Sequence, residues 1–208
     1  MGRDGKLFRF DERLQDGERN LVAGIDEAGR GPLAGPVVAA AVIFRRRIPL
    51  EGLNDSKKVS PRLRETLFRQ IVSQALVGIG QVSESLIDEM NIFQATRLAM
   101  RKAVLALPRT PTLLLIDGRI QLDLPLPQMG IVRGDGQSAA IAAASIVAKV
   151  YRDYRMKELD RLFPGYGFAR HKGYPTPGHL RALENQGVSS VHRKTFRPVA
   201  EALEEMVR

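Results

Sequence analysis

The chain has 208 residues, 44% hydrophobic and 26% charged, which is enough to bury a full hydrophobic core. It contains no cysteine, which excludes disulfides and thiolate metal sites and fits a reducing cytoplasm. No apolar run is long enough to span a bilayer, so we expect no membrane partner. The formal net charge of +9 indicates a polyanionic partner such as a nucleic acid.

The first 18 residues are polar and charged, and we expect them to form a flexible leader. They lack the apolar stretch of a secretory signal, which favours a cytoplasmic location. The remaining residues, 19–208, are predicted to form a single domain whose last part, from about residue 160, is helical. Monomer is the default expectation for a domain of this kind.

Apolar runs and helical periodicity alternate along the chain and predict an α/β domain with a mixed five-stranded sheet flanked by helices. The predicted strands are 21–26, 35–44, 76–82, 112–116 and 129–133. The predicted helices are 60–74, 83–90, 92–107, 138–162, 179–186 and 198–207.

Three of these strands end in acidic residues: Asp26 and Glu27, then Asp117, then Asp135. Two adjacent acids at a strand end are costly to hold together unless a divalent cation lies between them. If the three strands are parallel neighbours, the four carboxylates converge at one edge of the sheet. Four hard oxygen donors suit Mg²⁺ or Mn²⁺, and two such ions can support in-line displacement at a phosphodiester. Each acid alone is more often a turn residue, so only their joint pattern favours a site.

A glycine-flanked arginine, Gly29-Arg30-Gly31, directly follows the first pair of acids. Glycines let the backbone approach a ligand closely, although Gly-x-Gly alone is also a common turn signal. Residues 149–197 contain eleven Lys or Arg against four acids, together with all four tyrosines. Basic charge interleaved with aromatic rings suits phosphate contacts and stacking on nucleic acid. The three histidines are expected to be structural or phosphate-side residues rather than metal ligands, because hard cations prefer oxygen ligands.

With these motifs in order, the chain resembles the bacterial ribonuclease HII family over nearly all of residues 20–199. The resemblance implies a ribonuclease H-like fold with a C-terminal helical extension. The segments that carry it are Ala23–Pro32, Leu53–Lys58, Leu115–Gly118, Gly134-Asp135, Ala143–Val150, Phe163–Thr176 and His192–Pro198.

The resemblance also implies an activity: endonucleolytic cleavage of RNA in RNA–DNA hybrids, and cutting 5′ of a single ribonucleotide embedded in duplex DNA. The products would carry 3′-hydroxyl and 5′-phosphate ends. By motif position, Asp26, Glu27, Asp117 and Asp135 would be the catalytic carboxylates that bind Mn²⁺ or Mg²⁺, with two ions during catalysis.

The resemblance further assigns substrate contacts. Gly29, Arg30 and Gly31 would read the 2′-hydroxyl and hold the adjoining phosphate, and Tyr174 would pack on the deoxyribose that follows. The remaining phosphate contacts that it suggests are Lys57, Lys58, Ser145 and Lys149.

Two alternatives remain open at this point. A non-catalytic basic nucleic-acid-binding module would explain the charge and the tyrosines, but it would not need four acids at strand ends. A DNA nuclease or transposase-type enzyme on the same fold would use clustered acids, but it would not need a loop that reads a 2′-hydroxyl.

Overall fold

The computed structural model describes residues 3–15 and 20–207; residues 1–2 and 16–18 of the expected leader lie outside them. Its elements confirm the prediction of an α/β protein with one five-stranded sheet. The strands are β1 Val22–Ala28, β2 Val37–Ile43, β3 Leu76–Val82, β4 Leu113–Asp117 and β5 Gln128–Ile131. The helices are α1 Arg3–Glu12, α2 Pro61–Gln74, α3 Glu84–Leu105, α4 Ala139–Leu162, α5 Phe168–His171, α6 Pro177–Gln186 and α7 Arg197–Val207, with a 3₁₀ turn, η2, at Gly134–Gly136.

The sheet has the strand order β3-β2-β1-β4-β5. Strands β3, β2 and β1 form an antiparallel meander, whereas β4 and β5 run parallel to β1. The three strands that precede the predicted carboxylates are therefore parallel neighbours, as the convergence of those carboxylates requires. In register, Ile25 of β1 lies beside Ile116 of β4, so Asp26 and Asp117 follow on adjacent strands.

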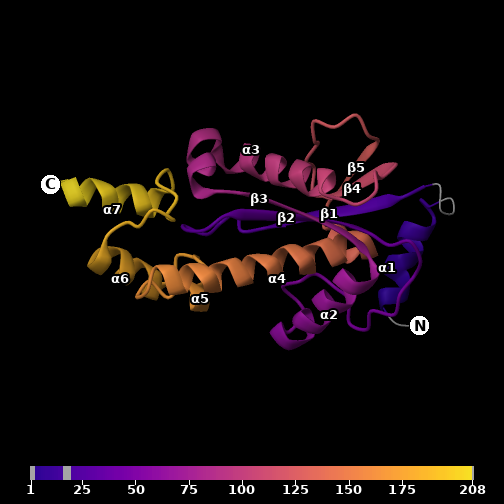
Figure 1. Ribbon diagram of the computed structural model, residues 1–208, viewed down its shortest axis with the longest axis horizontal. Helices are drawn as coiled ribbons and strands as arrows, with labels where there is room; N and C mark the ends of the chain where they lie inside the picture. The colour runs from indigo at the N-terminus through magenta and orange to yellow at the C-terminus, as the bar shows by residue number, and fades with distance from the viewer. Residues whose placement is uncertain (1–2, 16–19, 208) are drawn as a thin grey trace.

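Helices cover both faces of the sheet (Figure 1). Helix α3 lies on one face, and its core includes Ala99, Met100 and Ala103. Helix α4 lies on the other face, with α2 and α1 packed against it. Helix α5 lies beside α4, and helices α6 and α7 extend beyond the end of the sheet, which agrees with the predicted C-terminal helical extension (Figure 1). In the described ranges, no helix is long and apolar enough to cross a membrane.

Helix α4 approaches β1 very closely because both contact surfaces consist of small residues. The first turns of α4 bury a run of alanines, and β1 has a glycine, Gly24, opposite them. A Cβ atom on Gly24 would lie only 2.1 Å from the Ala140 carbonyl carbon and 2.2 Å from the Ile141 nitrogen. The helix backbone thus rests directly on the strand, which sets the distance between β1 and every side chain that α4 directs toward it.

The two helices predicted at 83–90 and 92–107 are continuous except for a break at Asn91. Asn91 has a φ of 68° and a ψ of 162°, outside the helical region. Its side-chain oxygen accepts hydrogen bonds from the N–H groups of Phe93 and Gln94, so it caps the second half of α3.

The N-terminal segment differs from the expected flexible leader. Arg3–Glu12 forms α1, and Leu7 and Phe8 are buried against the core beneath α4. The Phe8 ring packs on Phe44 with their centroids 5.0 Å apart. The Asp11 carboxylate accepts a hydrogen bond from the Ala140 N–H at 2.8 Å, in the first turn of α4. The charged residues around these few apolar ones hide the amphipathic pattern in the sequence.

We predict that Gly24→Ala destabilises the protein by at least about 3 kcal/mol, because the added methyl group overlaps the α4 backbone. The control is Gly178→Ala in α6, where the added Cβ would have only an ordinary contact of 3.9 Å with Thr176. It should be neutral or stabilising by up to about 1 kcal/mol, because alanine favours the helix. Urea unfolding of both variants checks this, and equal stability of the two would refute the packing argument.

Candidate functional site

A cavity of about 720 Å³ opens where β1, β4, η2 and α4 meet, and it contains nearly all of the predicted site residues. The predicted residues that line it are Asp26, Glu27, Gly29, Arg30, Gly31, Lys57, Asp117, Asp135, Ser145, Lys149 and Tyr174. Lys58 does not line the cavity; its ammonium lies 3.7 Å from the Asp55 carboxylate. The fold therefore brings together residues that are up to 148 positions apart (26 to 174) in the sequence.

Asp26 and Glu27 are held at the end of β1 in a low-dielectric position. Asp26 is 6% exposed, and its Oδ1 accepts a hydrogen bond of 2.7 Å from the Glu27 N–H. Burial raises the pKa of Asp26 well above its usual range, and the charges of Glu27 and Asp117 raise it further. Burial also raises the pKa of Glu27, although Arg30, which pairs with Glu27 at 3.3 Å, partly offsets this.

The other two carboxylates come from the parallel strands beyond β1. Asp117 ends β4, and its Oδ1 accepts a hydrogen bond from the Gly134 N–H at 2.7 Å. This bond ties β4 to the turn that contains Asp135. Asp135 lies in η2 rather than at a strand end, and burial followed by the charges of Asp55 and Asp117 raises its pKa. The four carboxylates thus act on one another electrostatically across one cavity.

This donor set fits a hard divalent cation. Burial raises the pKa values of Asp26 and Asp135, and repulsion by neighbouring carboxylates raises them further, so a cation placed between these groups would stabilise their charged forms. All four offer oxygen, the donor that Mg²⁺ and Mn²⁺ prefer, and no histidine lines the cavity. Within the described ranges, no three His, Cys, Asp or Glu side chains lie close enough together to hold a metal ion as they stand. The fit to a cation therefore rests on the kind of donor and on their shared cavity.

The Gly29-Arg30-Gly31 loop is held from behind by a buried arginine, Arg193. Its guanidinium donates hydrogen bonds to the carbonyl oxygens of Gly29, Arg30 and Gly35 at distances of 2.6–3.0 Å. The carbonyls of the loop therefore point inward. Among the described residues, the N–H groups of Arg30 and Gly31 have no hydrogen-bond acceptor, which leaves these donors for a ligand.

Tyr174 lies beside this loop, although it comes from the far end of the chain. A Cβ on Gly31 would be 3.6 Å from the Tyr174 ring, and the Leu33 N–H donates to the Gly173 carbonyl at 2.8 Å. A second buried arginine, Arg152, also joins the two loops, because it donates to the carbonyls of Ala34 and Lys172. Tyr174 is 43% exposed, so its ring is available at the cavity.

The expectation that the tyrosines and cations of residues 149–197 form one nucleic-acid surface is wrong in several positions. Tyr166 is buried and stacks on Phe168, with ring centroids 5.2 Å apart. Arg152 and Arg193 are 1% and 0% exposed and bind backbone carbonyls rather than phosphates. The sequence pattern does not distinguish these buried arginines from exposed ones, because their burial depends on contacts with loops that are distant in the sequence.

The predicted phosphate contacts differ in how available they are. Lys149 lines the cavity but pairs with Asp153 one turn along α4, and burial lowers its pKa. The Ser145 hydroxyl lies 2.9 Å from the Ser56 hydroxyl, and both side chains are buried. Lys57 is exposed at the cavity wall.

The cavity is also lined by residues that were not predicted to belong to the site: Ala28, Asp55, Ser56, Arg64 and Arg152. Asp55 lines the wall next to Lys57 and raises the pKa of Asp135. Arg64 of α2 donates to the carbonyls of Ser56 and Val59 and so holds the loop that contains Asp55. The Leu53–Lys58 motif pointed to this loop, but its spacing does not reveal which side chains face the acids.

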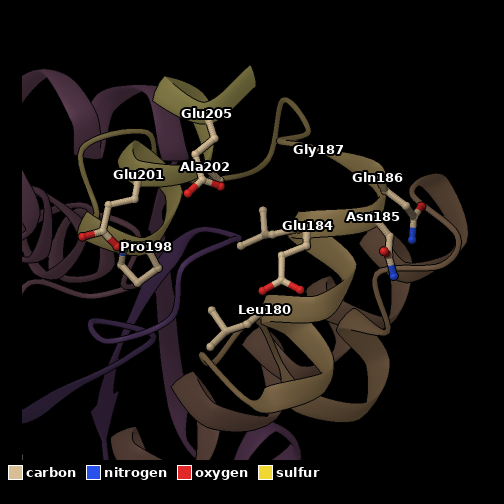
Figure 2. Close-up of a pocket in the computed structure, with 10 residues that line it drawn as sticks. Leu180, Glu184, Asn185, Gln186, Gly187, Pro198, Glu201, Ala202 and Glu205 are labelled. Atoms are coloured by element: carbon tan, nitrogen blue, oxygen red, sulfur yellow. The ribbon is translucent and has the colours of Figure 1, made fainter. Parts of the chain in front are cut away.

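A second cavity, of about 710 Å³, lies between α6 and α7 (Figure 2). Three of the side chains that line it are acidic, Glu184, Glu201 and Glu205, and none of the predicted site residues is among them. Phosphates would be repelled there, so nucleic acid is better accommodated at the first cavity.

This sheet and this cavity define a phosphodiester-cleaving enzyme of the ribonuclease H fold class. A family model described as Ribonuclease HII matches residues 23–199. Ribonuclease HII of Geobacillus kaustophilus is 54% identical over 199 residues, which cover 95% of this chain and 76% of that protein. Ribonuclease HII of Vibrio campbellii is 53% identical over 184 residues, covering 88% of this chain and 87% of that protein.

Solved structures agree with these matches. The crystal structure of ribonuclease H2 from Pyrococcus horikoshii superposes with a TM-score of 0.78 and 26% identity, covering 90% of this chain and 99% of that one. A ribonuclease HIII solved in complex with Mn²⁺ has the same fold, with a TM-score of 0.71 and 20% identity over 94% of this chain and 72% of its own. The chain belongs to the ribonuclease HII family, and the prediction from its motifs is confirmed.

A chain of histidines behind the cavity supports Tyr174. The His192 Nδ1 accepts a hydrogen bond from the Ser189 N–H, so its proton is on Nε2, 3.0 Å from the His179 Nε2. The His179 Nδ1 in turn lies 3.0 Å from the Tyr174 carbonyl oxygen. Burial, together with the neighbouring His179, lowers the pKa of His192 to about 4. His179 and His192 thus have a structural role, which is one of the two roles expected of the histidines.

We predict that this pKa makes stability depend on pH. Between pH 6.5 and about 4 the unfolded chain binds a proton at residue 192 that the folded chain does not, so stability falls as the pH falls through this window. Over this pH range the free energy of unfolding should fall by about 2 kcal/mol more for the wild type than for His192→Gln, because glutamine cannot bind a proton. Urea unfolding at several pH values measures the difference, and parallel pH profiles for the two proteins would contradict it.

Proposed function

We propose that this chain cuts RNA within RNA–DNA hybrids and cuts 5′ of a single ribonucleotide embedded in duplex DNA, leaving 3′-hydroxyl and 5′-phosphate ends. The observation that carries the proposal is that four carboxylates, the Gly29-Arg30-Gly31 loop and Tyr174 line one cavity. A site with only the carboxylates would suit any phosphodiester, whereas this loop and ring add the means to recognise a sugar. The proposed location is the cytoplasm, which the absence of cysteine fits.

Asp26, Glu27, Asp117 and Asp135 are proposed to hold one or two Mg²⁺ or Mn²⁺ ions. When bound there, such ions would lower the pKa of the attacking water and stabilise the leaving oxygen. The protein contributes the fixed positions of the acids, since the Gly134 N–H holds Asp117 and the Glu27 N–H holds Asp26. Burial of Asp26 excludes bulk water from the deepest part of the site and strengthens electrostatic interactions in it.

Recognition of the ribonucleotide is proposed to depend on the backbone of the glycine–arginine loop. The 2′-hydroxyl is the one group that separates RNA from DNA at a given position, and it can both donate and accept. The available N–H groups of Arg30 and Gly31 can bind this hydroxyl or the adjoining phosphate, because Arg193 turns the loop carbonyls inward. The Arg30 side chain already pairs with Glu27 and can also meet a phosphate.

The function is tested by metal titration of cleavage on two DNA duplexes that differ only in one ribonucleotide. Asp26→Asn should cut at less than about a tenth of the wild-type rate at any metal concentration, because the cation site loses a ligand. It should still bind the duplex, or bind it more tightly, because a charge that repels phosphate is gone. The control, Asp123→Asn, removes the same charge from an exposed position in the β4–β5 loop and should cut normally.

Equal cleavage of both duplexes by the wild type would favour a general DNA nuclease. Binding without cleavage at any metal concentration would favour the non-catalytic module. Normal cleavage by Asp26→Asn would refute the role of the carboxylates.

Tyr174 provides a separate test of sugar recognition. Tyr174→Ala should lose about ten- to a hundredfold in activity on a single embedded ribonucleotide, because the ring that packs on the next deoxyribose is gone. Tyr174→Phe keeps the ring and should lose much less. Rates on duplexes with one and with four ribonucleotides, at fixed metal, distinguish this role from loop packing. Wild-type activity of Tyr174→Ala on the single ribonucleotide would show that the ring only covers the loop.

A further inference from the structure

A third cavity, of about 420 Å³, lies between α1 and the turn that follows Asp135. Its side chains from the N-terminal segment include three cations, Lys6, Arg9 and Arg13, and among the described residues no acid lines it. The opposite wall is formed by Gly136 and Gln137. A Cβ on Gly136 would meet no atom within 4 Å, so the space beside this glycine is not filled by another part of the protein.

Lys6 and Arg9 lie on one face of α1 at helical spacing. Arg13 directly follows the helix, where its N–H donates to the Arg9 carbonyl at 3.4 Å, and we call the three together the basic face of α1. All three side chains are exposed. The opposite face of the helix carries the buried Phe8 and Asp11. Leu7 is also buried, and it lines the cavity together with Phe10. The helix is therefore amphipathic, with a basic side toward solvent and an apolar side toward the core.

Helix α1 is held firmly enough to present this face in a fixed position. The Asp11 carboxylate binds the Ala140 N–H at 2.8 Å, and Phe8 packs on Phe44. Because α4 begins directly after the turn of Asp135, α1 is fixed relative to that turn as well. The basic face thus has a defined place next to the catalytic cavity.

The two cavities meet at this turn: Asp135 lines the catalytic cavity, and Gly136 and Gln137 line the basic one. A polyanion bound at the carboxylates and continuing past Asp135 would arrive at Lys6, Arg9 and Arg13. Tyr174 and Arg30 line the catalytic cavity itself, so α1 adds contacts that neither of them supplies.

We propose that the basic face of α1 is a phosphate-binding surface that holds the backbone of the substrate duplex outside the catalytic cavity, on the side of Asp135. This inference rests on the proposed function only for the identity of the duplex. The surface contacts phosphates rather than bases, so it contributes affinity without sequence or sugar preference. It extends the interface beyond the C-terminal half of the chain, where the sequence has its largest basic excess.

The test compares two triple variants that each lower the formal charge from +9 by three. The first is Lys6→Gln/Arg9→Gln/Arg13→Gln. The matched control is Arg101→Gln/Lys102→Gln/Arg109→Gln, whose exposed cations lie at the end of α3 and just beyond it, on the other face of the sheet. Duplex binding is measured by fluorescence anisotropy from about 50 to 200 mM salt, without divalent metal so that no cleavage occurs.

The α1 variant should show a log–log salt slope that is shallower by about two to three, and an affinity at least about tenfold weaker at the upper salt concentration. The control should keep the wild-type slope. At saturating duplex with metal, the α1 variant should cleave within twofold of the wild type, because its carboxylates are untouched. An unchanged slope in the α1 variant, or the same change in both variants, would overturn the proposal.

A milder variant, Lys6→Gln/Arg13→Gln, guards against loss of α1 itself and should give about two-thirds of the slope change if the helix is intact. Thermal melting confirms that the variants remain folded. Extending the duplex stepwise on each side of the ribonucleotide should show, on one side, an increment of wild-type affinity that the α1 variant lacks. Binding to ordinary duplex DNA tests the basic face of α1 even if the wild type does not cleave. Failure of the proposed function can therefore be distinguished from failure of this proposal.

Discussion

The site depends first on how closely α4 lies on β1. Gly24 leaves no side chain between strand and helix, and the Ala140 and Ile141 backbone occupies the space that a Cβ would take. That contact sets the height of α4 above the sheet, and with it the positions of Ser145, Lys149 and Arg152 relative to the acids of β1. The start of the helix is fixed twice more, by the cap from Ser138 and by the Asp11 carboxylate from α1.

The protein holds the four carboxylates at one cavity and does not neutralise most of them with cations. Only Glu27 has a direct cation partner, Arg30, among the four proposed metal ligands in the described chain. The two buried arginines, Arg152 and Arg193, bind backbone carbonyls rather than these carboxylates. Direct ion pairs would lower the repulsion, but they would also occupy the oxygens that a cation needs. The raised pKa of Asp26 is thus the cost of keeping the site available.

The strands, the long helices and the convergence of four acidic residues on one cavity could be predicted from the sequence, because each depends on a local pattern. An apolar run ends at Asp26 and another at Asp117, and parallel strands bring such ends to the same edge of a sheet. Asp135 was found by the same rule, although it lies in a 3₁₀ turn rather than on the strand. The ribonuclease H fold could be predicted from the motifs of the ribonuclease HII family, which occur in the expected order over most of the chain.

What the sequence could not reveal depends on tertiary contacts. Helix α1 has only a few apolar residues among many charges, and its burial becomes visible only when α4 is present to receive it. Arg152 and Arg193 look like surface cations until the loops they join are folded. Asp55 sits in a recognised motif, but its direction is set by Arg64, which holds the loop from α2.

These buried contacts bear on specificity, because charge alone cannot separate RNA from DNA. Both backbones present the same phosphates, so a basic surface adds affinity equally for either strand. Discrimination between RNA and DNA must come from groups that are held in fixed positions around the sugar, where the 2′-hydroxyl is present or absent. In the proposed site those groups belong to the Gly29-Arg30-Gly31 loop and Tyr174, and each is fixed from the interior. Arg193 orients the first, and the chain from His192 through His179 holds the carbonyl of the second. A loop that could turn its carbonyls outward would offer the sugar both acceptors and donors. Arg193 prevents this by binding the loop carbonyls, so a residue that does not contact the substrate can determine which sugar is recognised.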